Sequence, residues 1–218
     1  MPNTPDPRLQ PYFTPDDIEA RSFAIIDAEA GDPKPFVGPQ WEIARRLVHT
    51  CADFDILPHL HFDKGAIEAG IAALRAGCTI YTDTEMARHG MPTRRLDALG
   101  AHAQCLLRLP HVAEHAKAHN TTRSRAAVAL AGERLAGCIL AVGNAPTSLL
   151  ALLDHLDAGG PAPALVIGMP VGFVNAAESK EMLLQWPGLT RIVLRGRKGG
   201  SPLAAATVNA LAELALRS

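Results

Sequence analysis

The segment Gly168–Lys180, GMPVGFVNAAESK, joins the apolar run Ala164–Ile167 to a run of helix-forming residues. This order is typical of a strand, a glycine-rich turn and the start of a helix. Such a turn brings backbone N–H groups and the positive end of a helix dipole to one point, which suits a carboxylate or a phosphate. Similar turns occur at Val142–Thr147 and Arg195–Ser201. Three such turns in the C-terminal half predict a ligand with several negative groups.

Outward from these turns, short apolar segments alternate with helical ones along the chain. The predicted strands are 78–82, 103–107, 138–142, 164–167 and 191–194, with a further extended segment at 54–62. The predicted helices are 15–30, 39–52, 63–76, 85–89, 111–118, 122–135, 147–157, 176–184 and 202–216. The alternation predicts a single α/β domain over residues 14–218, with a largely parallel sheet flanked by helices. Ligands bind such sheets beyond the carboxyl ends of the strands, where the three turns lie.

Composition excludes several functional classes. The 218 residues carry a net charge of −1 and only 5% aromatics, which argues against nucleic-acid binding. No segment approaches the roughly 20 apolar residues of a membrane span. Residues 1–13 are polar and proline-rich, without the pattern of a signal peptide, so we expect a flexible arm on a cytoplasmic protein. The four cysteines form no CxxC pair, and we expect reduced, mostly buried thiols, with a zinc site or disulfides as the alternative.

His49 is the first candidate for chemistry. On a helix it shares one face with Glu42, Arg45, Arg46 and Asp53, because these residues are three or four positions apart. This pattern is typical of a solvated helix face. A histidine can also give or take a proton near neutral pH, so a proton donor is the functional alternative.

Arg123 is the second candidate. Thr121 or Thr122 can cap the alanine-rich helix that follows, which would place the Arg123 guanidinium at a positive helix end. The pattern fits a plain cap with an exposed arginine. It also fits a clamp that binds a carboxylate through two parallel hydrogen bonds.

Metal and nucleotide sites have weaker support. His59, His61 and Asp63 would share one face of a strand and could form a metal triad, although one short motif is weak support. The loop Gly196–Ser201 superficially resembles a nucleotide-binding loop. It lacks the GxxxxGK[ST] pattern, and no GxGxxG follows the first strand, so nucleotide binding is not expected. Residues alone thus predict an α/β protein that binds a small polyanion.

Several motifs together resemble one family. Their order and spacing between Ile18 and Leu211 are similar to those of the precorrin-8X methylmutases of corrin (cobalamin) biosynthesis. The matching motifs are Arg21–Ile26, His49–Cys51, Asp83 with Met86 and Gly90, Thr121–Ser124, Gly143–Thr147, Pro170–Val174, Glu178–Lys180, Gly199–Ser201 and Asn209–Ala210.

The resemblance implies an isomerase that moves a methyl group from ring carbon eleven to ring carbon twelve of precorrin-8X or cobalt-precorrin-8. The product would be hydrogenobyrinate or its cobalt-containing counterpart, cobyrinate. The resemblance implies no cofactor and no protein-bound metal, since any cobalt is carried by the tetrapyrrole substrate. It further implies a homodimer with active sites near the subunit interface, and it leaves channelling with neighbouring pathway enzymes open. A non-catalytic carrier of corrinoid intermediates is the alternative.

The resemblance also assigns residues. His49 corresponds to the catalytic proton donor, and Ser22 and Arg123 correspond to residues that contact the substrate. Asn175 and Ala52 depart from the usual pattern, which affects the expected substrate preference more than the expected reaction. The remaining predicted substrate-binding residues flank the helix starts and turns: Thr121, Thr122, Asp83, Gly143, Asn144, Gly172, Gly199 and Gly200.

Overall fold

The computed structural model of the chain describes residues 14–217, so the predicted N-terminal arm at 1–13 lies outside the described residues. The predicted start of the first helix is confirmed. The Thr14 side chain accepts the N–H of Asp17, and the Asp17 carboxylate accepts the N–H of Thr14 in return. This reciprocal cap satisfies two backbone donors that a helix start otherwise leaves unpaired.

A six-stranded sheet forms the centre of the domain, in the order β1-β6-β5-β4-β2-β3. All neighbours are parallel except β1, which runs antiparallel to β6. The predicted single α/β domain with a largely parallel sheet is therefore confirmed. The strands are β1 Leu60–Phe62, β2 Thr79–Thr82, β3 His102–Cys105, β4 Ile139–Val142, β5 Leu165–Gly168 and β6 Arg191–Leu194.

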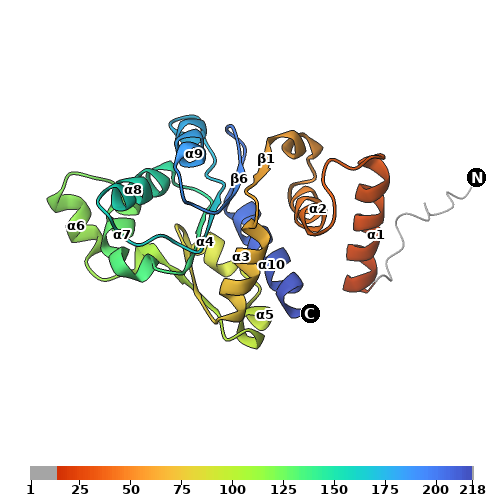
Figure 1. The fold of residues 1–218 in the computed structure, drawn as a ribbon, viewed down its shortest axis with the longest axis horizontal. Helices are drawn as coiled ribbons and strands as arrows, with labels where there is room; N and C mark the ends of the chain where they lie inside the picture. The colour runs from red at the N-terminus through yellow and green to blue at the C-terminus, as the bar shows by residue number, and fades with distance from the viewer. Residues whose placement is uncertain (1–13, 218) are drawn as a thin grey trace, which may run out of the picture.

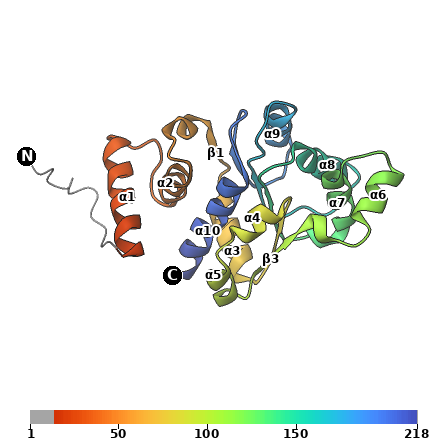
Figure 2. The ribbon, with the colours of Figure 1, turned by 180° about the vertical axis from the view of Figure 1, so that it is seen from behind.

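Helices cover both faces of the sheet (Figures 1 and 2). The α-helices are α1 Pro15–Glu29, α2 Pro39–Cys51, α3 Ala66–Arg75, α4 Glu85–His89, α5 Thr93–Ala98, α6 Val112–Ala118, α7 Arg123–Ala131, α8 Pro146–Asp157, α9 Ala176–Gln185 and α10 Ser201–Leu216. The described part of the chain also has short 3₁₀ helices: η2 Phe54–His59, η3 Leu106–Arg108 and η4 Gly132–Leu135.

Three local predictions were wrong. The extended segment 54–62 is η2 followed by the short strand β1, because the Asp53 carboxylate caps the turn at Asp55 and Pro58 has no N–H for a strand ladder. The helix expected over 122–135 ends at Ala131, and the chain continues as η4 from Gly132, where φ is +50°. Helix α5 was missed because its six residues are too few to show a helical period.

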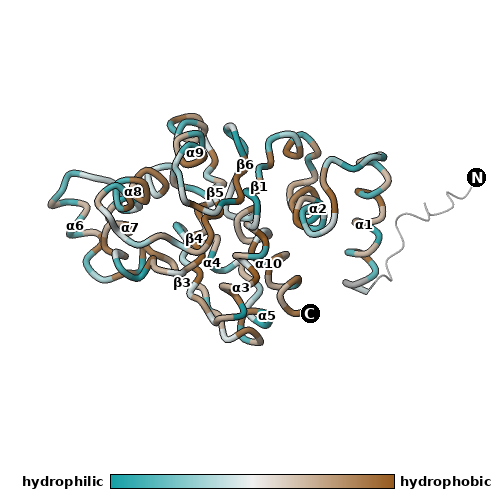
Figure 3. Tube along the Cα trace, in the orientation of Figure 1, coloured by the Kyte–Doolittle hydropathy of each residue, from teal (hydrophilic) through white to brown (hydrophobic). Residues whose placement is uncertain are grey.

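Alternate residues of each strand face opposite layers. One face, which includes Ile139 and Ile167, packs against α2, α3 and α10 in one hydrophobic core. The other, which includes Leu140 and Val166, packs against α6, α7 and α8 in a second core. Burial on both faces explains why the strands read as continuous apolar runs, which appear brown in Figure 3.

Helix α1 lies outside this sandwich. It packs against α2, on the side of α2 that faces away from the sheet (Figure 1). Among the described side chains of α1, Ile26 alone belongs to the buried core. Ion pairs from Glu19 and Asp27 and ring contacts of Phe23 join α1 to α2, beside the candidate site described below.

The cysteines are free thiols, as predicted, but they are less buried than expected. Cys105 and Cys138 are buried, Cys78 is half-buried, and Cys51 is exposed at the end of α2. Burial raises the pKa of Cys138 to about 12 and that of Cys78 to about 11, so both remain protonated at neutral pH.

Candidate active site between helices α1 and α2

A cavity of about 360 Å³ lies between α1 and the end of α2. Ser22 and His49 both line it, so the structure brings these two predicted site residues together. The remaining lining residues are mostly apolar: Ile25, Ile26, Glu29, Val48, Ala52 and Phe54. Mostly apolar walls with a few polar side chains, here Ser22, Glu29 and His49, are typical of a small-molecule site.

His49 lies in the last turn of α2 and is half-buried. Its ring packs edge-to-face against Phe23 of α1, with 5.4 Å between the ring centroids and 71° between the planes. Within residues 14–217, no group forms a hydrogen bond with the His49 ring, so both ring nitrogens can face a ligand.

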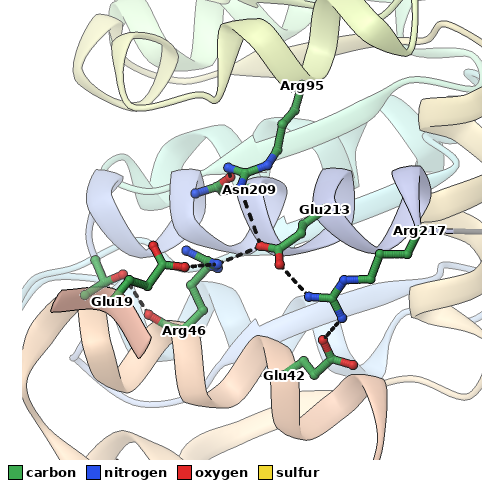
Figure 4. A network of polar contacts seen from close by, with 8 residues as sticks. Glu19, Glu42, Arg46, Arg95, Asn209, Glu213 and Arg217 are labelled. Carbon is green, nitrogen blue, oxygen red and sulfur yellow. Dashed lines mark hydrogen bonds and ion pairs between the residues drawn. The ribbon is translucent and has the colours of Figure 1, made fainter. Parts of the chain in front are cut away.

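The polar face of α2 is covered rather than solvated, which corrects the simpler sequence interpretation. The Arg46 side chain is 8% exposed and lies 3.0 Å from Glu19 of α1 and 2.7 Å from Glu213 of α10. Figure 4 shows the network around Glu213, which also binds Arg95 and Arg217. Helical spacing predicts which residues share a face, but α1 and α10 decide that this face is buried.

Charges within this network are well matched. Burial opposes ionisation of Glu213, but the hydrogen bond from Arg217 and the charge of Arg46 hold the pKa of Glu213 below its usual value. Arg217 also pairs with Glu42 near the start of α2. The network therefore ties α1, α2 and α10 together, and it fixes the helix that carries His49.

The glycine turn after β4 is occupied by a carboxylate of the chain itself. Asp83 is 1% exposed, and its oxygens accept the backbone N–H groups of Gly143, Asn144 and Ala145 at 2.9, 2.8 and 2.6 Å. Burial raises the pKa of Asp83, and the three N–H donors act in the opposite direction. The structure thus gives Asp83 a structural role, and the N–H groups of this turn are taken by its carboxylate; a substrate contact of Asp83 stays a prediction.

Gly143 has a packing role as well. A side chain at this position would place its first carbon 2.6 Å from the Ser201 Cα atom, so only glycine lets β4 end so close to the start of α10. The Gly143 N–H is bound by Asp83, and a contact of Gly143 with a ligand stays a prediction. Asn144, by contrast, is exposed and can reach a ligand through its side chain.

The turns after β5 and β6 bond to each other. Gly172 donates its N–H to the carbonyl of Arg197 at 3.1 Å, and Gly200 donates to Met169 at 2.9 Å. Gly199 lies so close to Met169 that a side chain would approach its carbonyl oxygen to 2.2 Å. These glycines permit a close approach of two loops, and the N–H groups of Gly172 and Gly200 are used inside the protein.

Lys180 supports this pair of loops, and its buried position was not predicted from the sequence. Its side chain is fully buried, and its ammonium donates to the carbonyls of Gly196 and Lys198, both at 2.8 Å. Burial lowers the pKa of Lys180 to about 8. Lys198 reaches back to Asp53 at 2.5 Å, which links the loop after β6 to the end of α2.

The predicted substrate-binding residues at the start of α7, Thr121, Thr122 and Arg123, lie on the opposite face of the sheet from His49. Thr122, rather than Thr121, caps α7, and its hydroxyl donates to Thr147 at 3.1 Å. Arg123 is exposed, and within the described part of the chain its guanidinium has no hydrogen-bond or ion-pair partner. Figures 1 and 2 place α7 at one end of the domain and α2 at the other. One chain therefore does not bring Arg123 to His49.

The metal alternative finds no support in the structure. His61 lies 2.8 Å from Asp63, and Asp63 is bound by Arg191 at 2.6 Å, while His59 is exposed on η2. No group of three or more histidines, cysteines or acidic residues within 14–217 could hold a metal ion. Over the same residues, no helix is long and apolar enough to cross a membrane.

Comparisons with known proteins identify relatives of the chain. Residues 17–214 match the family CbiC, precorrin-8X methylmutase. The chain is 45% identical to the precorrin-8X methylmutase of Sinorhizobium sp, over 89% of this chain and 92% of that protein. It is 44% identical to the cobalt-precorrin-8 methylmutase of Salmonella typhimurium, over 90% and 94%. A crystal structure of the precorrin-8X methylmutase from Thermus thermophilus matches with a TM-score of 0.82 and 44% identity, over 91% and 96%.

Proposed function

The chain belongs to the precorrin-8X methylmutase family, whose members are isomerases of cobalamin biosynthesis, and we propose that the cavity between α1 and α2 is its substrate site. The substrate is precorrin-8X or cobalt-precorrin-8, the compounds named for its relatives. The observation that carries the proposal is that His49 and Ser22 line the same, mostly apolar cavity, with the His49 ring free of hydrogen bonds within the described residues. Membership of a methylmutase family does not favour the alternative of a non-catalytic carrier.

His49 acts as a general acid. Its imidazolium gives a proton to a ring nitrogen of the substrate, which makes the conjugated system electron-poor. The bond between the methyl group and carbon eleven then breaks as the bond to carbon twelve forms, and the nitrogen returns its proton. Substrate and product are isomers, so the reaction needs no electron donor or acceptor. We therefore propose no separate cofactor, and any cobalt is part of the substrate. A positioned general acid contributes about 10²–10⁴-fold to the rate.

A second subunit completes the site in this proposal. The cavity of about 360 Å³ is at the lower end of the range for ligand pockets, roughly 300–1,000 Å³, so it holds only part of a tetrapyrrole with its carboxylate arms. Arg123 lies on the other face of the sheet, without a partner in the described residues, and can bind a carboxylate. We propose a homodimer in which Arg123 of one subunit approaches the His49 cavity of the other.

Exposed apolar side chains beside the cavity support the dimer. Ile18 and Ile25 on α1 are 52% and 57% exposed, and Val37 in the following loop is 77% exposed. Ile25 also lines the cavity, so exposed apolar surface borders the proposed site, as expected where a second subunit packs. A cytoplasmic location and channelling to neighbouring enzymes remain predictions.

Mixing two impaired variants tests the shared site, with the substrate kept well below its Kd so that the weaker binding expected of Arg123→Ala lowers the rate. His49→Ala and Arg123→Ala chains are unfolded together, refolded and assayed for conversion of precorrin-8X by its visible spectrum. A shared site predicts recovery of about a quarter of the wild-type activity, because half of the dimers are mixed and each mixed dimer has one intact site. A mixture no more active than the separate variants would place both residues in the same subunit's site.

A further inference from the structure

We propose that Phe23 is a positioning residue that fixes the imidazole of His49, and that Arg45 and Asp27 hold Phe23 in place. The inference rests on the proposed role of His49 as the proton donor. It concerns how the protein orients the His49 imidazole, whereas the proposed function concerns whether this imidazole donates the proton.

The first step is the contact with His49. A catalytic histidine is commonly oriented by a hydrogen bond to one ring nitrogen. Here no such bond is present within residues 14–217, and the His49 ring instead packs edge-to-face against Phe23, with 5.4 Å between the ring centroids. Aromatic pairs prefer this geometry and are stabilised by it. Phe23 therefore restricts the His49 ring while both nitrogens stay available to a ligand.

The second step is what holds Phe23. The guanidinium carbon of Arg45 lies 4.3 Å from the centre of the Phe23 ring, which is a cation–π distance. Arg45 and His49 are four residues apart on α2, so they contact Phe23 from two successive turns. Arg46 also lies near the ring, at 5.3 Å, but its guanidinium is bound to Glu19 and Glu213.

Asp27 in turn holds Arg45 in place. The Asp27 carboxylate accepts hydrogen bonds from Arg45 and from the indole N–H of Trp41, both at 2.7 Å. Burial opposes ionisation of Asp27, but these two hydrogen bonds hold its pKa below the usual value. Trp41 is 7% exposed and belongs to the core, so the series Trp41, Asp27, Arg45, Phe23 connects the core to His49.

Because most of the buried core lies outside α1, we expect a small shift of α1 to change the His49 site more than the stability of the domain. Helix α1 contributes one fully buried side chain to the first core, Ile26, and the half-buried Phe23 packs against that core, while ion pairs from Asp27 and Glu19 join α1 to α2. Loosening these contacts moves Phe23 and Ser22 relative to His49 but leaves the two large cores intact. A displacement of about 1 Å at a catalytic group can cost about a hundredfold in rate.

The test compares two variants that each lose one edge-to-face pair. Phe23→Leu removes the ring beside His49. Phe36→Leu removes the ring that packs against Phe62 at 5.2 Å and 74°, away from the α1–α2 cavity. We expect Phe23→Leu to lower kcat about ten- to hundredfold while the Kd of the product changes little, and Phe36→Leu to leave kcat unchanged. Phe23→Tyr keeps the ring and should restore kcat.

Outcomes of this test separate the inference from the proposed function. If His49→Ala abolishes conversion while Phe23→Leu keeps the wild-type kcat, or loses no more than Phe36→Leu, the positioning role is wrong and the proposed function stands. If His49→Ala converts substrate normally, the proposed function itself fails. Should Phe23→Leu not fold, as judged by circular dichroism, Asp27→Asn loosens Arg45 and is expected to lower kcat with the product Kd unchanged; a wild-type kcat would then overturn the inference.

Discussion

Replacing Asp83 by asparagine tests the role of the glycine turn after β4. The carboxylate accepts the N–H of Gly143 on one oxygen and the N–H groups of Asn144 and Ala145 on the other. An asparagine has one acceptor oxygen, so its amide nitrogen must face at least one of these N–H donors. A buried donor without a partner costs about 1–3 kcal/mol, and the remaining hydrogen bonds lose the assistance of a charge.

We therefore expect Asp83→Asn to lower the free energy of unfolding by about 2–4 kcal/mol. Urea unfolding followed by circular dichroism measures this change. The exposed Asp97→Asn serves as the control, and it should change the free energy by less than about 0.5 kcal/mol. At temperatures where the variant is folded, it should still convert substrate. An Asp83→Asn protein as stable as the wild type, with weakened product binding, would refute the structural role and return Asp83 to the substrate site.

Three further predictions concern charged residues. Arg123→Ala should weaken product binding by about 1.5–3 kcal/mol with little change in unfolding, as measured by calorimetric titration; unchanged affinity would remove Arg123 from the site. Glu213 has a lowered pKa, so the stability it contributes is complete above the ordinary value of 4.5 and is lost as the pH falls below it. Urea unfolding at pH 7 and pH 3 should show a smaller difference for Glu213→Gln than for the wild type. Burial lowers the pKa of Lys180 from 10.5 to about 8. Between these two pH values the unfolded chain binds more protons than the folded protein, so the free energy of unfolding should rise with pH. The Lys180→Met variant should lack this rise.

The fold could be predicted because its signals are local. Each central strand is a short apolar run bounded by turn residues, and burial on both faces makes such runs continuous, as at 139–142 and 165–168. The segment 54–59 was misread because a side-chain cap and a proline, rather than the apolar pattern, decide its conformation. Helix α5 was missed because a single short turn carries almost no periodic signal.

The candidate site could be predicted only in part, because its contacts join distant segments. The motif around His49 identified a polar helix face, but the sequence does not show that α1 and α10 bury Arg46 within it. The glycine turn at 143–145 was recognised as an anion site. The sequence could not show that Asp83, about 60 residues earlier, supplies the anion. Long-range pairing of this kind depends on the order of strands in the sheet, in which β2 lies beside β4.

Turnover by the His49→Ala variant is the most direct test of the account. The wild-type and variant proteins are incubated with precorrin-8X, and the change in the visible spectrum is followed as conjugation lengthens. The variant should fold and bind product normally, because the half-buried imidazole contributes little to packing, and its rate should fall by about 10²–10⁴-fold. A variant that converts substrate at the wild-type rate would contradict the assignment of His49 as the proton donor in the cavity between α1 and α2.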